Sequence, residues 1–142
     1  MNSYGLIDLH CDTLAEYWKY AHTGNPDTLD DPGRVLSLSN MPKDVHWAQF
    51  YAVFIPDEER GQAAIDYFEK NRVNFYRQME KFGDRVAPCR NADDMEKAWA
   101  AGKTAAFLTI ENGSVLAGVG LVAVVIIGVV LLRIIFVGLT FM

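Results

Sequence analysis

The chain is poor in several residue types, and each scarcity argues against a class of protein. Its two cysteines, Cys11 and Cys89, are too few for a framework of disulfide bonds. Its formal net charge of −5 and the lack of a basic patch argue against nucleic-acid binding. The N-terminus lacks a basic segment followed by a long apolar one, so we expect no secretory signal and a cytoplasmic protein. A length of 142 residues is nevertheless enough for one domain with its own core.

Charged residues are almost missing from the end of the chain. All 18 acidic residues and 12 of the 13 basic residues precede residue 115, which gives residues 1–114 a formal net charge of −6. The last 28 residues contain a single charge, at Arg133. We therefore divide the chain into a globular part, residues 1–118, and a hydrophobic tail, residues 119–142.

Three apolar segments are expected to form strands, at about residues 5–12, 45–55 and 104–111. The second is apolar on both faces, which is typical of a strand covered on both sides in a parallel sheet. Between the first two strands, residues 22–44 are interrupted by proline and glycine and predict a long irregular loop. Long loops are often functional, and this one is a candidate cover for a site at the end of the first strand.

Two helices are expected between the second and third strands. The first has Asp57 as its N-cap and ends at Gly83, and its apolar stripe is interpreted as core packing. The second is capped by Asn91 and stopped by Gly102. Alternating strands and helices predict an α/β fold in which helical crossovers join parallel strands.

Polar residues stand at the ends of two predicted strands. Because side chains repeat with period two along a strand, Asp8, His10 and Asp12 are expected to share one face. Cys11 then lies on the opposite face as a small buried residue. Glu111 ends the third strand, where a carboxylate is costly unless it is solvated, paired or bound to metal. An imidazole and two carboxylates suit a divalent metal such as zinc, which predicts a metal-dependent hydrolase; a simple surface pair of His10 with Asp12 is the alternative.

These segments together resemble the renal-dipeptidase-like zinc peptidases, the membrane dipeptidase family of the amidohydrolase superfamily. In most of that superfamily the first strand carries His-x-His, and His-x-Asp is typical of the dipeptidase branch. The similarity covers roughly residues 5–117 in the right order and spacing. It rests on Asp8-Leu9-His10-Cys11-Asp12-Thr13, on Ala48-Gln49-Phe50-Tyr51-Ala52-Val53, and on Ala101-Gly102-Lys103 followed by Ile110-Glu111-Asn112-Gly113.

The resemblance implies a (β/α) barrel of the TIM type that hydrolyses dipeptides at a two-zinc site. It implies that His10 and Asp12 bind one zinc ion and that Glu111 bridges both. In such a site a bridging hydroxide attacks the peptide carbonyl while the metals polarise its oxygen. The implied partner is a dipeptide substrate, and the matched segments identify no further catalytic residue.

The similarity accounts for only part of a barrel. Such a barrel has eight strands in about 250 residues, whereas this sequence supplies about three βα units. The other histidines, His22 in the loop and His46 at the start of a strand, do not replace the family's remaining ligands. We therefore expect the N-terminal third of a dipeptidase, with an incomplete second zinc site and with activity that is impaired or absent in this chain alone. A homo-oligomer in which further copies complete the barrel is one alternative.

The hydrophobic tail has three interpretations. Val119 to Leu132 contains no polar side chain, and about 20 apolar residues suffice to cross a bilayer. A transmembrane anchor on a non-catalytic, membrane-associated fragment is therefore the alternative function. The many β-branched residues favour a buried element instead, with residues 134–140 as a fourth barrel strand. A truncated or frameshifted reading frame is the third interpretation.

Overall fold

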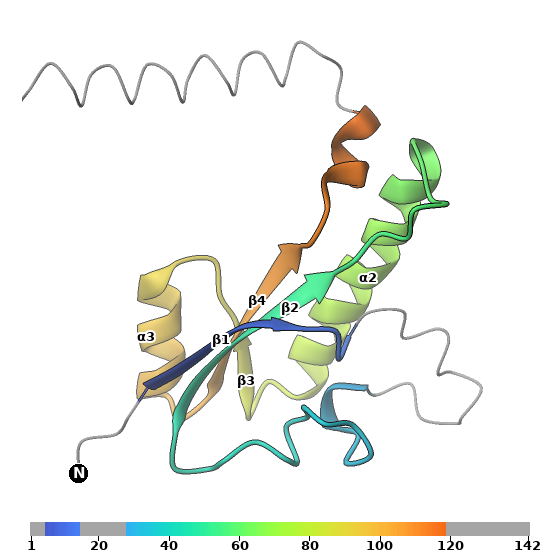
Figure 1. Cartoon of the computed structure of the whole chain (residues 1–142). Helices are drawn as coiled ribbons and strands as arrows, with labels where there is room; N and C mark the ends of the chain where they lie inside the picture. Colours follow the sequence, from blue (N-terminus) through green and yellow to red (C-terminus); the bar gives the residue numbers. More distant parts are fainter. Residues whose placement is uncertain (1–4, 15–27, 119–142) are drawn as a thin grey trace, which may run out of the picture.

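The computed structural model describes residues 5–14 and 28–118. Strands and helices alternate along these residues, with short 3₁₀ helices (η) near each end (Figure 1). The elements are β1 (Gly5–Cys11), η2 (Thr28–Asp30), β2 (His46–Val53), α2 (Gln62–Lys81), β3 (Val86–Pro88), α3 (Ala92–Ala100), β4 (Thr104–Ile110) and η3 (Gly113–Gly118).

The four strands form one parallel sheet in the order β1-β2-β4-β3 (Figure 1). The inner strands β2 and β4 pair without interruption from Ala48 opposite Ala105 to Val53 opposite Ile110. As predicted, β2 is largely covered on both faces. The short edge strand β3 was not expected, because three residues are too few to show an alternating pattern. The parallel α/β architecture is confirmed, and it is compatible with part of a (β/α) barrel.

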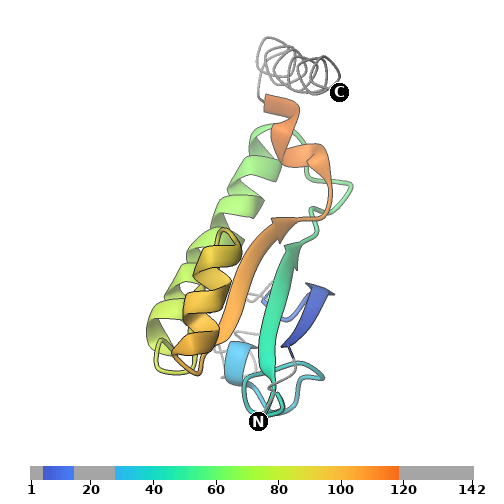
Figure 2. The ribbon, with the colours of Figure 1, turned by 90° about the vertical axis from the view of Figure 1, so that its left-hand side faces the viewer.

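The helices α2 and α3 pack on opposite faces of the sheet: they lie on its two sides in Figure 1, and α3 is the nearer of the two in Figure 2. In α2, Phe75 packs with Tyr51 and Ala106, whereas Ala98 of α3 packs with Ala105, whose side chain points to the other face. The strand order explains this arrangement. The chain passes β4 on its way from β2 to β3 and then turns back to β4, and two right-handed crossovers in opposite directions must lie on opposite faces. In a regular barrel the helices form one outer ring, so α3 departs from that pattern.

The predicted N-cap of the first helix, Asp57, is wrong. A turn follows Pro56 instead, in which the backbone N–H of Glu59 donates to the Pro56 carbonyl oxygen (3.0 Å). The helix α2 begins only after Gly61. Gly61 has a φ of 56°, in the left-handed region that favours glycine. Helix α2 therefore begins after Gly61 rather than after Asp57, the first acidic residue of this segment.

The predicted N-cap of the second helix is confirmed. The side-chain oxygen of Asn91 accepts a hydrogen bond from the backbone N–H of Asp94 (2.9 Å), which satisfies one free donor of the first turn. Gly102, with a φ of 70°, follows the end of α3 as expected. The sequence therefore defines α3 more sharply than α2.

The predicted hydrophobic tail, residues 119–142, and His22 of the loop lie outside the described residues. Within residues 5–14 and 28–118, no helix has both the length and the apolar character needed to span a bilayer.

Candidate metal centre

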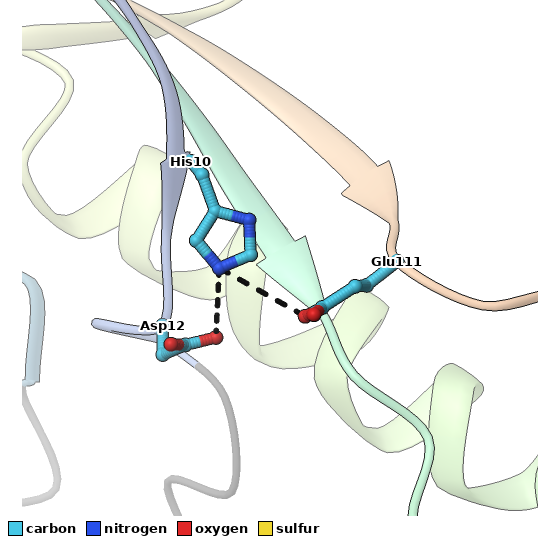
Figure 3. Close-up of side chains that lie close together, drawn as sticks. All are labelled: His10, Asp12 and Glu111. Atoms are coloured by element: carbon cyan, nitrogen blue, oxygen red, sulfur yellow. Dashed lines mark ion pairs between the residues drawn. The ribbon is translucent and has the colours of Figure 1, made fainter.

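His10, Asp12 and Glu111 meet at the carboxyl ends of β1 and β4 (Figure 3). Nε2 of His10 lies 3.5 Å from Oδ1 of Asp12 and 3.8 Å from Oε2 of Glu111. One donor atom from each residue lies within 4.8 Å of the other two. The structure thus brings together the three residues that the sequence predicts as metal ligands, although residues 10 and 111 are far apart in the chain.

The spacing and chemistry of these donors fit a divalent cation. Two ligands of a tetrahedral zinc ion, each about 2.0–2.1 Å from the metal, lie about 3.4 Å apart, close to the two distances from the imidazole nitrogen. The side chains of His10, Asp12 and Glu111 are 50%, 66% and 40% exposed, so a cation reaches them from solvent. Two carboxylates also offset the charge of a dication.

The backbone holds Glu111 firmly. Its N–H donates to the carbonyl oxygen of Val53 (3.1 Å), which continues the β2–β4 pairing one residue past the end of β4. The next residue fixes the turn, because the side chain of Asn112 donates to the Ile55 carbonyl oxygen (2.7 Å) and accepts from the N–H of Ser114 (3.2 Å). The sequence predicts a turn at Asn112 but gives no signal for these two contacts.

A β-bulge in β1 decides where His10 lies. Asp8 pairs with Gln49 and Cys11 pairs with Tyr51, so three steps along β1 match two steps along β2. The extra residue reverses the alternation of side chains between Asp8 and Cys11. The prediction that Asp8 shares a face with His10 is therefore wrong, because Asp8 lies on the face of Gln49 and Tyr51, toward α2. His10 lies on the other face.

Cys11 lies on the face opposite His10, as the sequence predicts, but it is only partly buried. It contacts the core cluster that contains Leu14, Tyr51 and Phe75, and both cysteines are free thiols. Burial raises the pKa of the Cys11 thiol to about 11. At neutral pH the thiol therefore stays protonated, a form that binds metal poorly.

An open cleft of about 780 Å³ lies beside His10 and Asp12. Besides the end of β1, it is lined by the loop residues Asp31, Gly33, Arg34, Val35 and Leu36. The hydroxyl of Thr13 donates to the carbonyl oxygen of Leu36 (2.8 Å), which ties this part of the loop to the end of β1. Residues 31–36 of the predicted loop thus lie beside the candidate metal centre.

His46 takes no part in this centre. It is the first residue of β2, at the opposite end of the sheet, and its ring lies 5.6 Å from the ring of Trp99. This placement agrees with the expectation that His46 does not act as a ligand.

A parallel α/β sheet with acidic and histidine side chains at its carboxyl ends is the arrangement expected of a metal-dependent hydrolase. The family comparison is more specific: the model of the membrane dipeptidases (peptidase family M19) matches residues 1–141, and the chain belongs to that family. The match extends past the quoted segments into the hydrophobic tail. No curated protein matches the chain. Family membership implies a hydrolase that acts on peptides.

Proposed function

We propose that the chain binds zinc through His10, Asp12 and Glu111 and that this centre serves the hydrolysis of dipeptides. The observation that carries the proposal is the convergence of one imidazole and two carboxylates from β1 and β4 within 4.8 Å. Membership of the membrane dipeptidase family supports the same reaction and the same metal.

The protein side chains have separate tasks in this proposal. His10 offers a neutral imidazole nitrogen, and Asp12 and Glu111 offer carboxylate oxygens that balance positive charge. Zinc, when bound, polarises a carbonyl group and lowers the pKa of water to about 7. Asp31 and Arg34 bring charges of both signs to the neighbouring cleft, which complements a dipeptide with its free amino and carboxyl groups.

The described residues support one cation site. Across residues 5–14 and 28–118, His10, Asp12 and Glu111 are the one group of three such donors close enough to hold a metal together. We therefore expect about one equivalent of zinc per chain, because the described residues offer no second group of three donors for the other ion of a two-zinc centre.

Zinc titration of the metal-free chain by calorimetry tests the proposal directly. We expect His10→Ala to weaken zinc binding by about 100-fold or more, beyond the 10–100-fold that outer contacts of a metal site typically contribute. His46→Ala is the matched control, because it removes a histidine at the far end of the sheet, and it should bind zinc like the unaltered chain. Equal binding by His10→Ala and the unaltered chain would remove the proposed centre.

Dipeptide hydrolysis is measured separately, with the zinc-loaded chain and the same two variants. We expect turnover that is lost in His10→Ala and kept in His46→Ala. Zinc binding without any turnover would leave the metal centre standing and show that this chain alone is not a dipeptidase.

A further inference from the structure

The β-bulge in β1 is held by a side chain that is not itself a candidate ligand. Oδ1 of Asp8 accepts a hydrogen bond from the backbone N–H of His10 (3.1 Å), a local contact in which an aspartate fixes the backbone two residues ahead. The main chain of Asp8 is also held, because the amide of Gln49 donates to its carbonyl oxygen (3.5 Å). The Gln49 side chain that makes this contact is fully buried.

The alternative to the bulge is a regular strand, and it has a definite consequence. With Asp8 still opposite Gln49 and no extra residue, His10 comes to lie opposite Tyr51 and turns into the core under α2. Cys11 comes to lie opposite Ala52 and moves to the other face of the sheet. The imidazole and the Cys11 thiol therefore exchange faces between the two registers.

We infer that Asp8 is a positioning residue of the metal centre: its carboxylate holds the bulge that turns His10 toward Glu111 and keeps the partly buried Cys11 thiol packed against the core. The expected effect of Asp8 on metal binding rests on the proposed function. The register itself is independent of the metal.

The rate of thiol labelling in the metal-free chain reports which register β1 adopts. In Asp8→Ala the acceptor is lost, and we expect Cys11 to react with a maleimide about 10-fold faster than in the unaltered chain. In Asp8→Asn the side-chain oxygen is kept, and labelling should stay slow. Cys89, buried beside α3 and β4 and remote from the bulge, is the internal control, because a change of register in β1 leaves its surroundings unaltered.

Zinc titration of the same three proteins then measures how the register of β1 affects zinc affinity. We expect Asp8→Ala to bind zinc about 10–100-fold more weakly and Asp8→Asn to bind it within a few-fold of the unaltered chain. If none of the proteins binds zinc but Cys11 still becomes reactive in Asp8→Ala alone, the register inference stands and the proposed function fails.

Two results overturn the inference. One is slow labelling of Cys11 together with unchanged zinc affinity in Asp8→Ala, which shows that the bulge needs no carboxylate. The other is loss of zinc binding in Asp8→Asn as severe as in Asp8→Ala with Cys11 protected in both, which assigns Asp8 a role through its charge. A reactive Cys89 in Asp8→Ala shows that this variant unfolds. In that case Asp8→Asn is compared with Asp8→Ser, which places a shorter acceptor at this position. The labelling rate of Cys11 and the zinc affinity of these two variants then decide the inference.

Discussion

The strands β1 and β4 both deliver side chains to the candidate metal centre, but they do so in different ways. β4 is an inner strand whose pairing with β2 is regular over its length, and its alanines Ala105 and Ala106 are fully buried. β1 is an edge strand with a bulge, and its apolar residues Ile7 and Leu9 are 51% and 70% exposed. Glu111 therefore takes its place from the sheet as a whole, whereas His10 takes its place from one local irregularity.

The two ligands Glu111 and His10 therefore depend on different parts of the molecule. Packing between α2 and the inner strands fixes the carboxylate, and loss of that packing should affect the whole domain. A few contacts near Asp8 fix the imidazole, so changes in β1 should affect the site more than the stability of the fold.

The largest expected effect is loss of the packing beneath the inner strands. Phe75 of α2 is 1% exposed and meets the ring of Tyr51 edge-on, with centroids 6.1 Å apart. We expect Phe75→Ala to lower the free energy of unfolding by about 3–5 kcal/mol, measured by chemical denaturation. Val73→Ala on the same helix, at a position 57% exposed, should change it by less than about 0.5 kcal/mol. Similar losses in both variants would contradict the proposed division between a packed and an open region.

A direct comparison of the two strands gives the next effect. Ala106 of β4 lies against α2 with no exposed surface, so Ala106→Leu forces extra volume into a filled space and should cost about 1–3 kcal/mol. Leu9→Ala in β1 removes a mostly exposed side chain and should cost less than about 0.5 kcal/mol. Melting curves of both variants provide the test. A larger loss for Leu9→Ala would show that β1 is packed as β4 is.

Sequence patterns predict the regularly paired strand β4 and the helix α3 well. The apolar segment at residues 104–111 predicts β4 and its terminal Glu111, and Asn91 predicts the start of α3, because alternation and capping are local properties. Asp57 misled the prediction of α2, since a turn and a positive-φ glycine intervene before the helix begins. The order of the strands and the placement of α3 depend on pairing between distant segments, which no local pattern encodes.

The two-residue spacing of a regular strand predicts one shared face for Asp8, His10 and Asp12, but β1 is not regular between Asp8 and Cys11. His10 and Asp12 still meet Glu111, because the bulge moves only Asp8 to the other face and leaves the His-x-Asp pair together. Bulges arise from pairing with a neighbouring strand, so the sequence of β1 alone does not reveal one.

A smaller effect is expected at Tyr51, which pairs with Cys11 of β1 on one side and with Leu108 of β4 on the other. Its hydroxyl is buried and has no hydrogen-bond partner among the described residues, and burial raises its pKa. We expect Tyr51→Phe to raise the free energy of unfolding by about 1 kcal/mol, because an unsatisfied buried hydroxyl is costly. A clear loss of stability in denaturation experiments would show that the hydroxyl makes a favourable hydrogen bond between the two regions.

The smallest effect concerns the ion pair that ties the loop to the amino-terminal end of β4. Arg85 donates two hydrogen bonds to the carboxylate of Asp30 (3.1 and 2.7 Å), and its carbonyl oxygen accepts from the N–H of Thr104 (2.9 Å). The hydrogen bonds from Arg85 lower the pKa of Asp30 below its usual 3.8. The resulting stabilisation is therefore complete above about pH 4 and disappears as the pH falls through the lowered pKa.

Because both side chains are partly exposed, we expect the pair to contribute about 0.5 kcal/mol at neutral pH. Asp30→Asn should lower the free energy of unfolding by this amount near pH 7 and by less near pH 3, where the unaltered chain has begun to lose the same contribution. Glu96→Gln, at an exposed position of α3, should leave the difference between the two pH values unchanged. An equal effect of Asp30→Asn at both pH values would show that the loop is held by contacts other than this charge, and that the ordered end of β4 needs no ion pair.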